Sequence, residues 1–145
     1  MFEIRRVTRA NAELLDNVAA DVFDYEIDPG LLREYLTAAD HLLVVAVTTE
    51  ASSGISAGTV VGQAAAVIHR HPDQPTELYI DNLGVDPAMH RRGIATALLD
   101  ELFELGRARG CREAWVGTEP DNQAANALYR HYAEREEMVM YAWRL

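Results

Sequence analysis

A basic turn that contains a glycine lies in the middle of the chain and has the composition of an anion-binding site. It reads His90-Arg-Arg-Gly-Ile-Ala-Thr96, and it joins a strand-like run over 77–85 to a helix-like run over 95–105. The first N–H groups of a helix have no intrahelical partner, and the helix dipole adds positive potential there. Gly93 would let a ligand approach the backbone. We therefore expect this turn to bind a phosphate or pyrophosphate. The alternative is an ordinary strand-to-helix turn with solvated arginines.

The pair His69-x-His71 is a second candidate site, because imidazole side chains can bind a metal ion. Zinc sites in proteins use at least three protein ligands. No third ligand is spaced nearby, and His71-Pro72 is typical of a loop. The sequence therefore predicts no metal site.

Charge and composition narrow the classes of partner. The formal net charge is −10, which argues against nucleic-acid binding because that needs a basic face. An acidic surface attracts cations such as polyamines or amino sugars, although acidic residues also simply promote solubility. No run approaches the roughly eighteen apolar residues of a membrane helix, so no membrane association is expected. The first residues also lack the apolar stretch of a signal peptide. Cys111 is the only cysteine, so no intramolecular disulfide can form and a cytoplasmic location is expected.

The elements that must position these residues follow from apolar periodicity. The length fits a single domain over 1–145. Turn residues separate the periodic segments, and their order, β-α-α-β-β-β-α-β-α-β, fits an α+β fold. Strands are predicted over 2–7, 41–48, 59–69, 77–85, 113–117 and 138–143. Helices are predicted over 11–23, 29–36, 95–109 and 122–133.

Two motifs in this order resemble those of the Gcn5-related N-acetyltransferase superfamily. The run 83–87 followed by 90–95 is similar to the coenzyme A motif of that family, (Arg/Gln)-x-x-Gly-x-(Gly/Ala), with His90 at its first position. Asn122-x-x-Ala-x-x-Leu-Tyr129 is similar to the second signature, but the usual Gly-Phe after it is absent. The runs 77–85, 90–98, 127–129 and 135–140 more closely resemble aminoglycoside 3-N-acetyltransferases of this type.

The resemblance implies a fold and a cosubstrate. The fold would be a mixed, mostly antiparallel central sheet flanked by about four helices, with a splayed strand pair that holds acetyl-CoA. Pantetheine would lie along Leu83, Gly84 and Val85, where Gly84 is consistent with a bulge, a close backbone approach or simple packing. Pyrophosphate would contact the backbone N–H groups of the turn. The remaining expected cofactor-binding residues are Arg91, Arg92, Gly93, Ile94, Ala95, Thr96 and Asn122.

The implied reaction is attack of an amine on the thioester carbonyl, which needs a base and a proton donor. Tyr129 would donate to the departing thiolate, unless it is a core tyrosine. Asp81 is our first choice of base, because strand alternation places it on the same face as Tyr79 and Leu83. It could instead anchor the substrate amine or be a structural carboxylate. Glu119 is the second choice of base.

The expected acceptor is a small cationic amine, above all an aminoglycoside acetylated at its 3-N position. Asp24, Glu26 and Asp28 form an acidic cluster in a helical region that commonly lines the acceptor site in the family, and Glu119 is a further expected substrate-binding residue. These charges could also be merely solvated. The alternatives are acetylation of a polyamine, another small amine or a peptide N-terminus, or a non-catalytic acyl-CoA-binding module. Homodimers are frequent in the family, so a homodimer is also expected.

Overall fold

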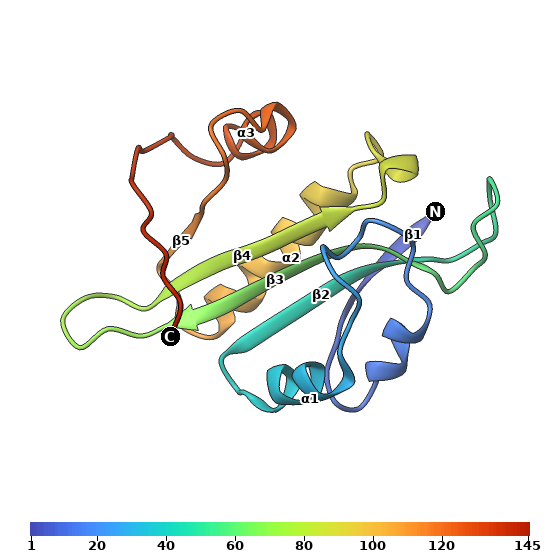
Figure 1. Ribbon diagram of the computed structural model, residues 1–145, viewed down its shortest axis with the longest axis horizontal. Coiled ribbons are helices and arrows are strands. Elements are labelled where there is room, and N and C mark those ends of the chain that lie inside the picture. Colours follow the sequence, from blue (N-terminus) through green and yellow to red (C-terminus); the bar gives the residue numbers. More distant parts are fainter.

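Five strands form one mixed sheet in the order β1-β2-β3-β4-β5, in a computed structural model that describes residues 1–145 (Figure 1). Its first three interfaces are antiparallel and the β4–β5 interface is parallel. The parallel pair needs a crossover connection, which the helix between β4 and β5 supplies. The strands are β1 (Phe2–Arg6), β2 (His41–Thr48), β3 (Val60–His69), β4 (Glu77–Val85) and β5 (Glu113–Val116).

Helices cover both faces of the sheet. The helices are α1 (Pro29–Thr37), α2 (Ile94–Ala108) and α3 (Gln123–Tyr129), with 3-10 turns η1 (Ala12–Asp16) and η2 (Pro87–Met89). One core lies between α2 and the sheet and includes Leu98 and Ile80. The other lies on the opposite face, includes Val22 and Val45, and is bordered by residues of α1. β2 is apolar and buried through to Thr48 because it contributes to both cores. No helix has both the length and the apolar content to cross a bilayer.

The predicted α+β fold is confirmed, but the first predicted helix, 11–23, is wrong. Only the short η1 turn forms there. The side chain of Asn11 accepts the backbone N–H of Thr8 at 2.7 Å, which closes a local turn. The chain then pairs with β3, because Val60 donates to Asn17 and Ala19 donates to Val60, both at 2.9 Å. This pairing overrides the helical spacing of the apolar residues.

The predicted closing strand, 138–143, is also wrong for this structure. Helix α3 ends at Tyr129, four residues before the predicted 133, and the chain beyond it forms no strand. Its apolar side chains are exposed, with 73 to 81% of Met138, Val139, Met140, Tyr141 and Trp143 accessible. The segment is a short continuous apolar run, which is compatible with a strand, but no neighbouring strand pairs with it within the chain.

A β-bulge separates the two halves of β4. Ala66 pairs with Ile80 and Ala65 pairs with Asn82, so Asp81 is the extra residue. The pairing of β4 with β5 stops at the same point, at Ile80 and Val116. From Asp81 to Val85, the outer edge of β4 therefore has no partner strand. This is the splayed strand pair that the sequence predicts, with the bulge at Asp81 and not at Gly84.

Gly84 has a different role, close contact with the backbone before α1. A Cβ atom at this position would lie 2.2 Å from the carbonyl oxygen of Val22. Both groups are backbone, so relieving the overlap would require a shift of β4 or of the chain around Val22. Gly84→Ala should therefore lower the free energy of unfolding by about 2–3 kcal/mol.

Gly117→Ala is the matched control for this prediction, because nothing lies within 4 Å of an added Cβ there. Urea unfolding followed by circular dichroism measures both variants. Equal midpoints for the two would show that Val22 does not restrict Gly84.

Candidate active site

The turn before α2 presents a row of unpaired N–H groups. From Arg91 to Thr96, no backbone N–H donates to any acceptor in the protein, and the first that does is Ala97, to Gly93 at 3.0 Å. Arg91 and Gly93 have positive φ angles of 62° and 77°. Gly93 is the N-cap residue of α2 and offers no side-chain cap. The exposed N–H groups and the helix dipole together form a cradle for an anion.

Two side chains hold this turn against the end of β4. Asp86 accepts the N–H of Ala88 at 2.9 Å and so caps η2. The ring Nε2 of His90 lies 3.1 Å from the carbonyl oxygen of Val85. His90, which departs from the family motif, therefore fixes the turn and leaves the N–H groups free. Arg91 and Arg92 are exposed, and neither forms an ion pair.

The open edge of β4 offers further backbone groups to a ligand. Asp86 donates to Val61 of β3 at 2.9 Å, so positions 82 and 84 also pair with β3 in this antiparallel ladder. The N–H and C=O groups of Leu83 and Val85 then point to the open side. The carbonyl of Val85 is already hydrogen-bonded by His90. Three backbone groups therefore remain free on this edge: the N–H and C=O of Leu83 and the N–H of Val85. A pantetheine amide chain needs donors and acceptors of this kind.

The other predicted cofactor residues differ in what they can offer. The side chain of Ile94, the first residue of α2, is buried between this helix and the sheet. Only its backbone N–H therefore faces the turn. Ala95 is partly buried and Thr96 exposed. Asn122 caps α3, because its side-chain oxygen accepts the N–H of Ala125 at 3.1 Å. Its cofactor contact, like the others, stays a prediction.

Gly93→Ala is expected to weaken binding of coenzyme A by about tenfold. A side chain at positive φ is strained, and the added methyl group would stand among the N–H groups that receive the pyrophosphate. Gly110→Ala is the matched control: Gly110 has φ 88° at the other end of α2, and an added Cβ is equally free of contacts. Calorimetric titration with coenzyme A would compare the two, and equal affinities would exclude the cradle as the pyrophosphate site.

The carboxyl group of Asp81 lies at the bulge where the open edge of β4 begins. The residue is exposed as a whole, yet surrounding groups desolvate its carboxyl and raise its pKa above the ordinary value, an effect that the positive field of His41 partly offsets. Its charge in turn raises the pKa of Tyr35, after burial, which is the larger cause. Asp81 therefore faces the α1 side of the sheet.

Tyr35 and His41, which sequence reasoning missed, accompany Asp81 there. The hydroxyl of Tyr35 donates to the carbonyl of Leu42 at 2.6 Å, and its ring stacks on His41 with centroids 4.7 Å apart. The Nδ1 atom of His41 is buried without a partner. These residues belong to no motif, and only the packing of α1 on β2 brings them together.

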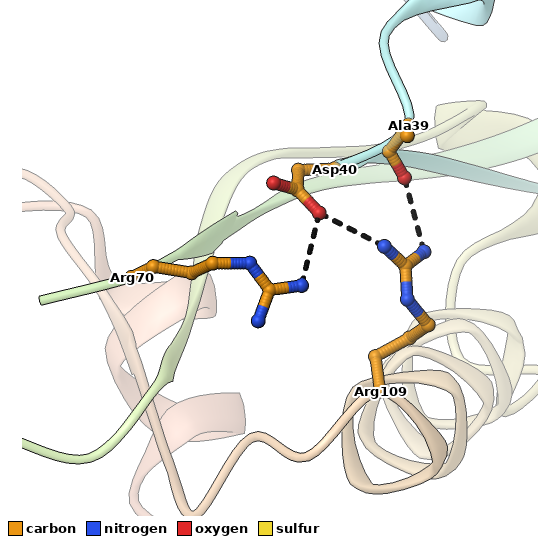
Figure 2. Close-up of polar contacts among 4 residues, drawn as sticks. All are labelled: Ala39, Asp40, Arg70 and Arg109. Carbon is orange, nitrogen blue, oxygen red and sulfur yellow. Dashed lines mark hydrogen bonds and ion pairs between the residues drawn. The ribbon is translucent and has the colours of Figure 1, made fainter.

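A polar clamp fixes the chain just before His41 (Figure 2). Asp40 accepts from Arg70 at 3.3 Å and from Arg109 at 2.8 Å. Arg109 also donates to the carbonyl of Ala39 at 3.0 Å. The clamp joins the start of β2 to the ends of β3 and α2, and so fixes the backbone from which His41 projects.

The predicted face of Asp81 needs a correction. Simple alternation places Asp81 with Tyr79 and Leu83, but the bulge at Asp81 reverses the alternation beyond it. Leu83 instead packs with the core on the α2 side, whereas Asp81 interacts with Tyr35 and His41. The carboxylate and the Leu83 side chain thus lie on opposite faces.

Tyr129 is the last residue of α3 and is partly buried against the core on the α2 side. Burial raises the pKa of its phenol, so the group is protonated at neutral pH and can donate a hydrogen bond. Strand β5 leaves β4 and leads towards α3 (Figure 1). After Tyr129, Tyr132 donates to Asp100 of α2 at 3.2 Å and packs on Phe103. This contact holds the end of α3 where the family usually has Gly-Phe.

The predicted acceptor carboxylates are exposed. Asp24, Glu26 and Asp28 lie in the loop between η1 and α1, and the predicted helix before them does not form. Asp28 caps α1 by accepting the N–H of Leu31 at 2.9 Å, so it has a structural role. Glu119 lies between β5 and α3; its carbonyl accepts from Asn122 and Asn126, and its side chain is unpaired.

A mixed sheet with a splayed parallel pair, and an anion-binding turn at the start of the helix that connects the pair, are consistent with an enzyme that uses an acyl-CoA. Residues 12–133 match the model of the Acetyltransferase (GNAT) family. The chain belongs to this family, and it is an acetyltransferase with acetyl-CoA as its donor.

Relatives with known names are diverse. The N-alpha-acetyltransferase RimI of Mycobacterium tuberculosis is 33% identical over 130 residues, which cover 88% of this chain and 74% of that protein. Mycothiol acetyltransferase of Beutenbergia cavernae is 43% identical over 61 residues, 41% of this chain, but the match spans only 20% of that protein.

Solved structures with the same fold include aminoglycoside acetyltransferases. HMB0005, an aminoglycoside acetyltransferase from an uncultured soil metagenomic sample, is 25% identical with a TM-score of 0.82, covering 100% of this chain and 99% of that one. AAC(6')-Iy, solved with a bisubstrate analogue of coenzyme A and acetylneamine, has a TM-score of 0.77 at 22% identity, with coverage of 100% and 99%.

Proposed function

We propose that this acetyltransferase acetylates a primary amine of a polycationic acceptor, an aminoglycoside, at its 3-N position. The observation that carries the proposal is the carboxyl of Asp81 at the head of the open edge of β4, in a chain of net charge −10. The fold shared with HMB0005 supports the choice of acceptor. A free Cys111 is consistent with a reducing, cytoplasmic location.

In this proposal each part of the site has one task. The N–H groups of 91–96 bind the pyrophosphate, and the free backbone groups of Leu83 and Val85 align the pantetheine chain along β4. Acetyl-CoA supplies an acetyl thioester. Asp81 accepts a proton from the substrate ammonium, directly or through water, so that the amine can attack. Tyr129 donates its phenolic hydrogen bond to the sulfur that leaves.

The acceptor is identified by thiol release from acetyl-CoA over a panel of sisomicin, kanamycin, spermidine and short peptides. Aminoglycosides should give the highest kcat/KM, and KM should rise with ionic strength because exposed charges are screened by salt. Nuclear magnetic resonance of the product then gives the acetylated nitrogen. A product acetylated only at the 6' nitrogen would contradict the 3-N assignment. Turnover confined to monocationic amines would contradict the proposal that the acceptor is a polycation.

The exposed acidic loop offers a separate check of the acceptor. Asp24→Asn combined with Glu26→Gln should raise KM for the aminoglycoside about threefold to tenfold with little change in kcat, because only binding is weakened. Asp28 is left in place since it caps α1. Replacing Asp73, an exposed residue in the β3–β4 loop, by Asn is the control. Equal KM values in the unmodified enzyme, the double variant and the control would show that these carboxylates are only solvated and do not bind the acceptor.

A peptide N-terminus is a second candidate acceptor, and the observation that favours it is the 33% identity to RimI over 88% of this chain. The same panel separates the two: a peptide acceptor would show a higher kcat/KM than any aminoglycoside. Release of no thiol despite tight binding of coenzyme A would instead indicate a non-catalytic acyl-CoA-binding module.

We also propose a homodimer. The outer edge of β5 has no partner strand, and the continuous apolar segment 138–143 is exposed. If this segment added as a strand to β5 of a second copy, the open edge of β5 would gain a partner and the apolar side chains would be buried. Light scattering after size-exclusion chromatography should then give a dimer for the full chain and a monomer for a chain that ends at Glu137. A full chain that stays monomeric at 100 µM, roughly ten times a typical working concentration, would contradict the dimer.

A further inference from the structure

A cluster of three metal-ligating side chains lies at the end of the β3–β4 hairpin where the connecting loop joins the two strands. His69 and Glu77 are paired across the two strands, and His71 follows β3. The Nε2 atom of His71 is 3.0 Å from Oε2 of Glu77, and Nδ1 of His69 is 3.9 Å from the same oxygen. One ligand atom from each side chain lies within 4.8 Å of the others. The strand register thus supplies the third ligand that the sequence spacing does not show.

The separations suit a transition-metal ion. Zinc binds nitrogen and oxygen at about 2.0–2.2 Å, so neighbouring ligands of a tetrahedral ion lie roughly 3.3 Å apart. The distances from Oε2 of Glu77 to the two histidine nitrogens, 3.0 and 3.9 Å, lie on either side of this separation. Two imidazoles and a carboxylate are the donors of zinc, cobalt, nickel or copper sites, whereas magnesium and calcium prefer oxygen alone.

The surroundings favour His71 and Glu77 as ordered ligands. Their side chains are only 16% and 18% exposed. The amide of Gln74 lies 3.2 Å from Nδ1 of His71, the ring nitrogen that faces away from Glu77. Such an outer partner orients a ligating histidine, and the amide can present its oxygen to a protonated Nδ1.

We propose that His69, His71 and Glu77 bind a divalent transition-metal ion, with zinc as the test ion, and leave one coordination position open to water. The site lies four residues before Asp81 on β4, which is about 13 Å along a strand, and at the opposite end of β4 from the turn that precedes α2. It therefore joins the ends of β3 and β4 without taking part in acetyl transfer. A bound ion would stabilise the folded state, and this stabilisation would grow with the logarithm of the ion concentration above the Kd.

The test is calorimetric titration of zinc chloride into the metal-free, untagged full chain, with the melting temperature measured in parallel. We expect one ion per chain with a Kd in the micromolar range and a rise in melting temperature that a chelator reverses. His71→Gln should weaken binding at least tenfold and abolish the rise. His131→Gln, at an exposed histidine after α3, should bind zinc like the unmodified chain.

Glu77→Gln provides a second variant if His71→Gln folds poorly, since the amide keeps the shape of the side chain and removes the charged ligand. Circular dichroism confirms that each variant is folded before titration. The absence of saturable zinc binding to the unmodified chain would overturn the proposal. Equal affinity in the unmodified chain and both variants would also overturn it, because the ion would then be bound elsewhere.

Discussion

Tyr129→Phe should lower kcat by about a hundredfold or more and leave the Kd for coenzyme A unchanged. The phenol at the end of α3 is the proposed hydrogen-bond donor, and burial raises its pKa so that it stays protonated. Positioned acid catalysis contributes about this factor to a rate. Removing one hydroxyl from a half-buried ring leaves its packing on the α2-side core in place. Stopped-flow thiol release under conditions where chemistry limits the rate measures the effect.

Tyr132→Phe is the matched control for Tyr129→Phe. Its hydroxyl donates to Asp100 on α2, so its loss should cost some stability and little kcat. If the two variants lose activity to the same small degree, another group must protonate the thiolate. A large loss in Tyr132→Phe alone would place the donor after the end of α3.

Asp81→Asn should lower kcat by about a hundredfold or more and remove the acidic limb of the pH profile. Desolvation raises the pKa of this carboxyl, so in the unmodified enzyme kcat/KM should rise with pH through a value above the ordinary one for aspartate. Glu119→Gln, at the alternative base, is the control and should keep both rate and profile. An unchanged kcat in Asp81→Asn would move the base to Glu119 or to water.

The same pKa shift predicts the effect of Asp81 on stability. A carboxyl whose pKa is raised in the folded state favours folding below its unfolded pKa, about 3.9. That contribution to stability is lost as the pH rises through the pKa of the carboxyl in the folded state. At pH 7 the charged carboxylate therefore opposes folding, and Asp81→Asn should be at least as stable as the unmodified chain. A lower urea midpoint for the variant at pH 7 would show that Asp81 is a structural carboxylate.

Local features of the sequence predicted most of the sheet and the anion-binding turn. The unpaired N–H groups of 91–96 follow from a helix that starts at a glycine, and β4 forms over the predicted 77–85. The helix over 11–23 failed because its apolar spacing is overridden by pairing between Val60 and residues 17 and 19. Such long-range pairing leaves no periodic signal in the sequence.

The parts of the site that the sequence could not predict depend on register. A bulge at Asp81 reverses which side chains face α1, and nothing in the residue types marks it. Tyr35 stacks on His41 only because α1 packs on the start of β2, and the charges of Asp81 and these two residues act on one another across elements. Glu77 likewise joins His69 and His71 only through the pairing of β3 with β4. These contacts join residues on different elements, which spacing along one element cannot reveal.

Mass spectrometry of the acceptor after incubation with acetyl-CoA shows whether the acetyl group reaches an aminoglycoside amine. With ¹³C-labelled acetyl-CoA and sisomicin, we expect one labelled acetyl group on an amine of the acceptor. The reaction should depend on Tyr129 and Asp81, and one free thiol should appear for each acetyl group transferred. Intact acetyl-CoA with unmodified aminoglycoside, polyamine and peptide acceptors, under conditions where coenzyme A binds, would contradict it.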